Sequence, residues 1–278
     1  MFGLDPAPSY HLARPPIVEA LGQVRFPVLA RLNSLDGIAP VQDRLERIFP
    51  YMKLEQVQQV SLFVGASGSS GGENRAIQTW RFTDDSGWSV IIAPDRATLS
   101  ADQRYEGFSQ FADHFYPVLA ALAEGAGVSR AERLGLRYLN VAEIPLNDKG
   151  AWRQWFRPEL VGWSGSEAVA DTTRLLTSIT QTHLSAAPVG ELSGPPVDIQ
   201  ALIRNGLIPA ETMIPGSQPR QPHHPAYLLD IDLFIDAPQT FDVEELSRQM
   251  TMLHDQIDRF FFWAVAEEGA RYFGRELR

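Results

Sequence analysis

The stretch 130–144, RAERLGLRYLNVAEI, lies at the midpoint of the 278-residue chain and alternates with the two-residue period of a β-strand. The face that holds Leu134 and Leu136 is largely apolar, whereas the opposite face begins with Arg133 and Arg137 and then becomes apolar. This pattern predicts a central strand with one face against a core and one mixed face. The segments before and after it follow the same order of elements, so we interpret it as the start of a second half.

The first half is predicted to contain a strand, a helix, three or four strands and a second helix. Alternation predicts strands at 17–26, 56–66, 77–82 and 88–93, with a short piece at 97–100. Residues 67–74, SGSSGGEN, are expected to form a flexible hairpin loop because of their composition. Ser100 and Gln103 have the spacing of a capping box, which predicts that the second helix starts directly after the last strand.

The second half is predicted to repeat this order. A helical segment at 150–161, which Pro158 should kink or break, is followed by strands at 172–184, 197–203 and 227–235. The proline-rich residues 208–225 are expected to form an exposed, mobile loop. The last helix follows Asp242, and its apolar residues are spaced alternately four and three apart, which predicts a long packed helix. This apolar stripe consists of Leu246, Met250, Leu253, Ile257, Phe260 and Ala264.

These elements predict an α+β fold built from two β-α-β(3–4)-α halves. The expected organisation is an extended N-terminal arm at 1–16, a first half at 17–128 and a second half at 129–278, with the two halves sharing one sheet. A unit of this kind used twice resembles the helix-grip and TATA-binding-protein-like folds, in which a curved antiparallel sheet surrounds a long helix. No sequence identity links the halves, so an internal duplication is inferred from the order of elements alone.

Composition narrows the classes of function. A formal net charge of −10 weighs against nucleic-acid binding, which needs a positive surface, although a local basic patch remains compatible with it. The chain has no cysteine, which excludes disulfides, thiolate metal sites and cysteine nucleophiles and suits a reducing cytoplasm. The N-terminus lacks the pattern of a signal peptide, and the longest apolar run, 260–266, is too short to span a bilayer. We therefore expect a cytoplasmic protein without membrane contact.

Six charged residues lie in pairs, each pair on one face of a predicted strand: Glu19 and Arg25, Arg133 and Arg137, Asp230 and Asp232. Side chains on one face of a sheet lie within reach of each other, so the six could form one network. That network is either a recognition surface for a peptide, nucleotide or anionic ligand, or a structural set of ion pairs. Because the central strand begins polar, we expect an open face on which Arg137 contributes little to stability.

The sequence contains no motif that nominates a catalytic residue, a cofactor or a metal. The GxSxG, P-loop, HExxH and GxGxxG spacings do not occur. Asp230 and Asp232 are carboxylates of the kind that Mg²⁺ prefers, but two aspartates at i and i+2 alone do not indicate a metal site. His223 and His224 lack a nearby third ligand, which favours loop residues over a zinc site.

Three consecutive aromatic residues, Phe261, Phe262 and Trp263, follow Phe260 in the predicted last helix. Consecutive residues of a helix point to different sides, so these rings cannot all face one core. They indicate either a helix that is buried on two sides or an interface with a protein partner or a second copy.

Three stretches carry a resemblance to a known family: PPIVEALGQVRF at 15–26, GLRYLN at 135–140 and LHDQIDRFF at 253–261. They resemble a sporadically distributed bacterial family of uncharacterised proteins of similar length, and the resemblance spans nearly the whole chain. No catalytic or binding residue is carried over from it. The patchy distribution of that family implies a dispensable gene, as in antiviral defence or toxin-control cassettes.

Three functions follow as expectations from different classes. The first is a non-catalytic cytoplasmic interaction or regulatory protein, with a protein partner or as a homo-oligomer. The second is a helix-grip-like sensor that holds a small-molecule ligand between the sheet and the C-terminal helix. An enzyme of unknown chemistry is the third, for which no nucleophile or base is nominated.

Overall fold

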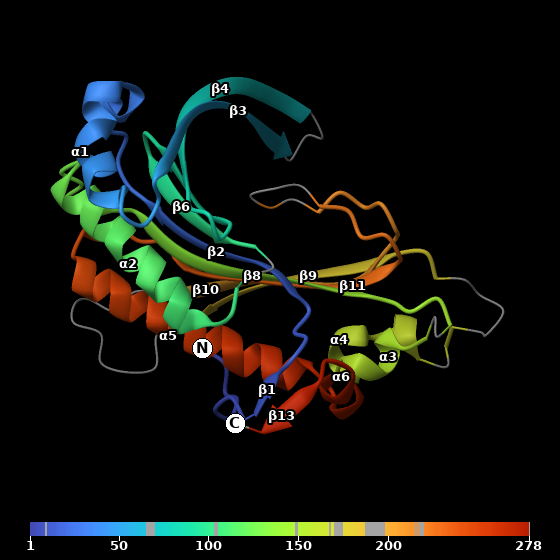
Figure 1. Cartoon of the computed structure of the whole chain (residues 1–278). Helices are drawn as coiled ribbons and strands as arrows, with labels where there is room; N and C mark the ends of the chain where they lie inside the picture. The colour runs from blue at the N-terminus through green and yellow to red at the C-terminus, as the bar shows by residue number, and fades with distance from the viewer. Residues whose placement is uncertain are drawn as a thin grey trace. The chain divides into compact units, whose positions relative to one another are not determined.

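The computed structural model describes residues 1–8, 10–64, 70–102, 105–147, 150–166, 168–169, 175–186, 198–214, 216 and 220–277. The chain is α+β, as predicted, with antiparallel strands and several helices (Figure 1). It divides into two compact units: unit 1 is Met1–Gly22, Leu134–Ala237 and Glu244–Arg278, and unit 2 is Gln23–Arg133 and Pro238–Val243. Strand β2 (Ile17–Arg25) supplies residues to both units.

Within unit 1, five of the described strands form one sheet in the order β2, β8, β11, β10 and β9. Their bounds are Arg133–Glu143 for β8, Ala226–Ile235 for β11, Ile199–Ile208 for β10 and Ser178–Ala186 for β9. From β8 to β9 each strand is antiparallel to its neighbour. The strands predicted at 130–144 and 227–235 are therefore confirmed. The strand predicted at 172–184 starts only at Ser178, with residues 170–174 outside the described part, and the one at 197–203 continues to Ile208.

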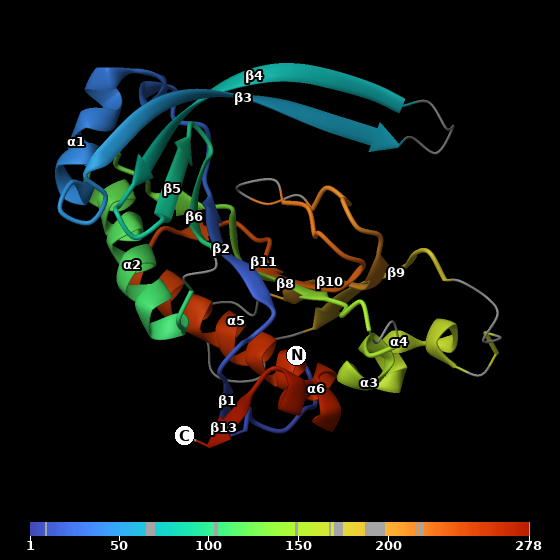
Figure 2. The same cartoon turned by 45° about the vertical axis from the view of Figure 1, so that its right-hand side comes forward.

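Helix α5 (Val243–Ala264) runs along one side of the unit 1 strands (Figures 1 and 2). All six members of the predicted apolar stripe are buried, and Leu246, Met250, Leu253 and Ile257 have no exposed surface. Burying a side chain of this size contributes roughly 1.5–3 kcal/mol, so the stripe is a main source of the stability of unit 1. A hydrogen bond of 3.0 Å between Tyr138 Oη and His254 Nδ1 also joins β8 to α5.

The predicted helical segment at 150–161 is two short helices, α3 (Trp152–Trp155) and α4 (Pro158–Val161). Pro158 occupies the first turn of α4, where its missing N–H costs nothing, so the predicted break occurs just before it. A 3-10 turn, η2 (Trp163–Gly165), follows. At the chain ends, β1 (Tyr10–Leu12) pairs with β13 (Arg275–Leu277), which follows α6 (Glu267–Tyr272).

The segment after β10 is not simply the exposed loop that the sequence predicts. Ile214 forms a bridge with Arg220 and is only 5% exposed. It packs in an apolar cluster with Leu139, Ile208 and Ala226, against which Val18, Val141 and Leu228 also pack. The prediction of an exposed segment is therefore wrong at Ile214. This apolar side chain lies in a proline-rich segment but is buried against apolar residues of the sheet.

Unit 2 has the strand order β3, β4, β5, β6, followed by the end of β2. The strands are β3 (Tyr51–Val64), β4 (Ser70–Thr83), β5 (Trp88–Ala93) and β6 (Arg96–Ala101), and the β3–β4 hairpin is visibly bent in Figure 2. The remaining elements are η1 (Ala30–Asn33), α1 (Leu35–Leu45), α2 (Phe108–Glu124), β7 (Arg130–Ala131) and β12 (Gln239–Thr240). Helix α2 buries Phe111, Phe115 and Leu119 without exposed surface, and His114 stacks on Trp88 with ring centroids 4.1 Å apart.

Two local predictions in unit 2 are wrong. Ser100 does not cap a helix, because it lies in β6 opposite Ser89 of β5, and α2 begins only at Phe108. Sheet pairing therefore overrides the local capping pattern at Ser100. Gln103, the other residue of that pattern, lies outside the described residues. The glycine-rich segment predicted as a loop at 67–74 is strand from Ser70 onward, and residues 65–69 lie outside the described part.

Candidate functional site

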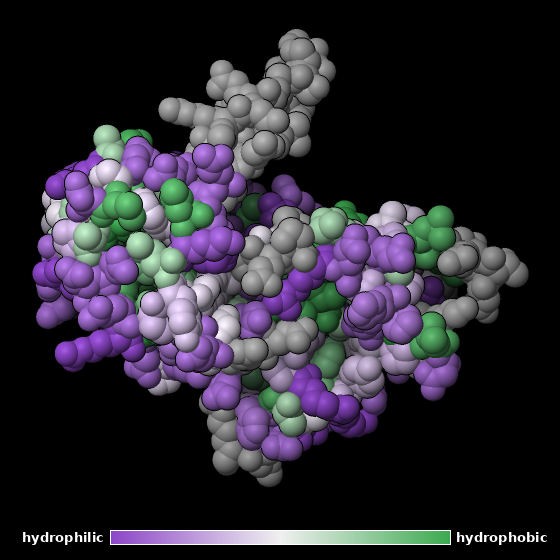
Figure 3. All heavy atoms as spheres, turned by 45° about the horizontal axis from the view of Figure 1, so that its top comes forward, coloured by the Kyte–Doolittle hydropathy of each residue, from purple (hydrophilic) through white to green (hydrophobic). Residues whose placement is uncertain are grey.

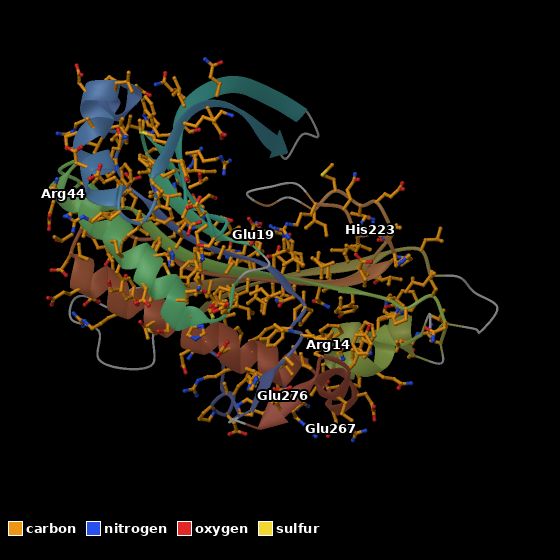
Figure 4. The ribbon with its side chains drawn as sticks, in the orientation of Figure 1. Arg14, Glu19, Arg44, His223, Glu267 and Glu276 are labelled. Atoms are coloured by element: carbon orange, nitrogen blue, oxygen red, sulfur yellow. The ribbon has the colours of Figure 1, made fainter. Side chains whose placement is uncertain are left out.

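The six charged residues of the predicted network divide between the two units. Glu19, Arg137, Asp230 and Asp232 belong to unit 1, whereas Arg25 and Arg133 belong to unit 2. Figure 4 labels Glu19, which lies on β2 and has no exposed surface. The network that can be described within one unit is therefore built around Arg137 and Asp230.

Arg137 and Asp230 form a two-pronged ion pair across β8 and β11. Arg137 Nε donates to Asp230 Oδ1 at 2.7 Å, and Arg137 Nη2 donates to Asp230 Oδ2 at 2.9 Å. In the register of the two strands Arg137 lies opposite Asp232, so its bond to Asp230 is a diagonal one. Parallel N–H···O bonds of this kind fix the guanidinium plane as well as its position.

A second arginine reaches the same carboxylate from the next strand. Arg204 of β10 lies opposite Asp230, and its Nη1 donates to Asp230 Oδ2 at 3.0 Å. Its Nε donates to Gln181 Oε1 at 2.9 Å, and Gln181 lies opposite Arg204 on β9. Gln181, Arg204, Asp230 and Arg137 thus form a row of side chains across four strands, which we call the arginine ladder.

The ladder combines a buried centre with partly exposed ends. The Asp230 side chain is 2% exposed, that of Arg137 is 22% exposed and that of Arg204 is 34% exposed. The expectation of an open face is therefore wrong for Asp230, because the two arginines and the neighbouring strands enclose its carboxylate. The two arginine side chains are therefore the partly exposed members of the ion pairs.

Burial disfavours the charged form of Arg137, but its hydrogen bonds to Asp230 and the charges of Asp230, Asp232 and Glu19 outweigh this effect. The pKa of Arg137 is consequently raised above its ordinary value. The guanidinium is therefore charged at every pH at which the protein is folded. Arg137 therefore contributes a permanent positive charge to the ladder.

This geometry bears on what the cluster can do chemically. An aspartate that accepts hydrogen bonds from two guanidinium groups is poorly suited to act as a base or to bind a cation, because either role would first break those pairs. Among the described residues no group of three or more histidine, aspartate and glutamate side chains is arranged to hold a metal ion. The arginines, by contrast, retain donors: within the described part of the chain, Arg137 Nη1 and Arg204 Nη2 make no hydrogen bond.

Sequence reasoning missed Arg204 and Gln181. The strand containing Arg204 was predicted to end at Ile203, which left the arginine outside it. Alternation continues from Ala201 through Ile203 and Asn205, and this pattern could have placed Arg204 on the same face as Leu202. Gln181 carries no chemical signal of its own, and only the register of β9 against β10 brings it to Arg204.

The three aromatic residues proposed as an interface largely pack inside unit 1. Phe261 is 9% exposed, and Phe262 packs edge-on against Tyr10 with centroids 5.4 Å apart. Trp263 contacts Phe260, and the Arg157 guanidinium lies 5.4 Å over its ring. These contacts account for the rings within the chain itself, so a partner is not needed to explain them.

The surface offers no single broad apolar patch in the view of Figure 3, where hydrophilic residues predominate and hydrophobic ones appear between them in small groups. Within the described residues, none of the helices has the length and apolar character that crossing a membrane requires. Comparison with models of protein families gives no match, and comparison with curated protein sequences gives none either.

Proposed function

We propose that the chain is a non-catalytic interaction or regulatory protein that binds a protein partner through the arginine ladder of unit 1. One observation carries this proposal. Arg137 and Arg204 are both fixed by the buried carboxylate of Asp230, and each still has a terminal nitrogen without a hydrogen bond in the described part of the chain. Two oriented, charged donors are therefore available to the oxygen atoms of a partner.

The physical argument is one of preorganisation. A free arginine side chain loses rotamer freedom when it binds, at a cost of about 0.5–1.5 kcal/mol, whereas the ladder has already fixed both side chains on folding. The planar guanidinium suits carboxylate oxygens and main-chain carbonyl oxygens of a peptide. Beside the ladder lie the partly buried Val18, Val141 and Leu228, which add apolar contact. A charged anchor next to apolar side chains is a common composition for a protein interface.

The proposed cellular setting of this interaction is the bacterial cytoplasm. A chain without cysteine suits the reducing cytoplasm, and the resemblance to a sporadically distributed bacterial family supports a role in a defence or toxin-control cassette. In that setting the partner would be encoded beside this chain, and the interaction would regulate it.

The proposal is tested by affinity capture from a lysate of the source organism, with wild type and two matched variants as bait. Arg204→Ala removes one anchor but leaves Asp230 paired with Arg137. Arg81→Ala is the control, because Arg81 is 19% exposed, is paired with Glu55 at 2.9 Å and belongs to unit 2, whereas the ladder belongs to unit 1. We expect wild type and Arg81→Ala to recover the same protein, and Arg204→Ala to recover at least about tenfold less, equivalent to 1.4 kcal/mol. Equal recovery by all three, or no specific protein with wild type, would contradict the proposal.

A small-molecule sensor is the second candidate function. Tyr138 and His254 place a hydrogen-bonded polar pair between the sheet and α5, where a helix-grip sensor would hold its ligand. Mass spectrometry of protein purified under native conditions distinguishes the two functions. A small molecule that is retained by wild type and lost in Tyr138→Phe, without any protein partner, would favour the sensor.

A further inference from the structure

Strand β9 is the outermost strand of the unit 1 sheet. It pairs with β10 on one side, and within the described residues no strand pairs with its other side. The seven residues between Ser178 and Ala186 are all exposed, including Ile179 at 49% and Leu184 at 39%. Among the described residues of unit 1, nothing pairs with the outer main-chain edge of this strand, and side chains on both of its faces are exposed.

The composition of β9 is unusual for an exposed edge. Its nine residues, SITQTHLSA, contain no lysine, arginine, aspartate, glutamate or proline, although 21% of the chain is charged. The outermost strand of unit 2, β3, carries Lys53 and Glu55 near its start. Charges, prolines and bulges are the means by which edge strands avoid pairing with other chains. Strand β9 has none of them in its sequence or its regular register.

The strand is also held in a fixed extended form. Three side-chain hydrogen bonds tie β9 to β10 and to Asp198, the residue that precedes β10. They join His183 to Gln200, Ser185 to Asp198, and Gln181 to Arg204. Close backbone approach adds to this, because a Cβ atom on Gly206 would lie 1.7 Å from Ser178 O. A partner strand would therefore meet a template that is already ordered.

We propose that a second copy of this chain occupies this edge, with the two β9 strands antiparallel about a two-fold axis at Thr182. In this register Thr182 lies opposite its own copy, Gln181 opposite His183, and Thr180 opposite Leu184. All nine residues are paired, which forms about eight to ten main-chain hydrogen bonds. The Thr–Thr pair at the axis is among the cross-strand pairs that stabilise antiparallel sheets.

Charge is the reason for choosing a second copy over another strand. A two-fold axis brings identical residues together, so any formal charge near Thr182 would meet its own kind. Each chain carries a net charge of −10, and two copies therefore repel one another unless the contact region is neutral. Strand β9 provides nine consecutive residues without a carboxylate, a lysine or an arginine. The contact is small, so the dimer should have a dissociation constant of roughly 1–100 µM.

Sedimentation equilibrium of the full chain over about 1–500 µM tests the proposal, together with two variants at the axis. Wild type should shift from monomer to dimer across this range. Thr182→Lys and Thr182→Glu should each remain monomeric, because they place like charges opposite one another, and an equimolar mixture of the two should dimerise again. Recovery on mixing requires residue 182 to face residue 182 of the other copy, so it tests the register as well as the interface.

Thermal melting followed by circular dichroism is the folding control, and both variants should keep the melting temperature of wild type because the side chain of Thr182 is exposed. Wild type that is monomeric at every concentration would overturn the proposal and leave a strand of a different protein as the occupant. Variants that dimerise as well as wild type, or a mixture that does not recover, would overturn the register. None of these measurements uses a binding partner, so their outcome is independent of the function proposed for the ladder.

Discussion

Arg137 and Asp230 are 93 residues apart in the chain, yet the guanidinium of the first donates two hydrogen bonds of 2.7 and 2.9 Å to the carboxylate of the second. The carboxylate is 2% exposed and receives a further bond from Arg204. A buried charge requires such partners, because removal of one partner leaves a desolvated ion incompletely paired.

Arg137→Ala should therefore lower the free energy of unfolding by about 2–4 kcal/mol, less than for a pair with no third member because Arg204 remains. Urea denaturation measures this loss, with Arg81→Ala as a matched control that should lose about 1 kcal/mol or less. Replacing Asp230 by Asn in the Arg137→Ala background should restore part of the loss. An Arg137→Ala protein as stable as wild type would mean that the carboxylate is solvated.

Leu253 has no exposed surface and lies in the middle of the apolar stripe of α5. Leu253→Ala should cost about 2–5 kcal/mol through lost burial and the cavity that remains. Thr251, on the exposed side of the same helix, supplies the control, and Thr251→Ala should change stability by about 0.5 kcal/mol or less. Thermal unfolding of Leu253→Ala and Thr251→Ala measures both effects. Equal melting temperatures of the two variants would mean that the apolar stripe is exposed to solvent.

Burial raises the pKa of the Tyr227 hydroxyl from 10.0 to about 12, although the hydrogen bond from Asn205 lowers it somewhat. Below pH 10 the phenol is neutral in both states, and its contribution to stability is complete. Above that pH the unfolded chain loses its proton first, so stability falls as the pH rises toward 12, by up to about 2–3 kcal/mol. Tyr227→Phe should show a smaller loss between about pH 9 and pH 11 than wild type does. Parallel losses in the two proteins would contradict the shifted pKa.

Ile214 anchors the segment after β10 to the sheet by packing in one apolar cluster with Leu139 and Ala226. Ile214→Ala should release this anchor and raise the rate of trypsin cleavage at Arg220, its bridge partner, by about tenfold. Limited proteolysis followed by mass spectrometry gives that rate. Unchanged cleavage would indicate that the segment opens equally often with and without the isoleucine.

The parts that sequence reasoning predicted well are those with strong local periodicity. The stripe of α5 needs only its spacing of three and four residues, and the alternation of β8 and β11 placed Arg137 and Asp230 on strand faces. The capping pattern at Ser100 failed because the pairing with Ser89, eleven residues away, is stronger than a local cap.

Only two of the four residues of the ladder, Arg137 and Asp230, could be predicted from the sequence. The other two depend on the register between neighbouring strands. Nothing near Arg204 in the sequence shows that it lies opposite Asp230, and a one-residue slip would have sent its side chain to the other face. The burial of Asp230 likewise comes from neighbours that are distant in sequence. Arg25 and Arg133 have the same chemistry as Arg137 but belong to the other unit, which alternation alone does not reveal.

Contact between the arginine ladder face of unit 1 and a protein partner can be detected by crosslinking. A photo-crosslinking phenylalanine derivative in place of Leu202, which lies on that face opposite Asp232, tests it directly in cells of the source organism. The control position is Leu54 in unit 2, which is 50% exposed. This contact should give one adduct of defined mass from position 202, which is lost when Arg204→Ala is added, and no adduct from position 54. An adduct from position 54 alone, or one at position 202 that persists without Arg204, would contradict it.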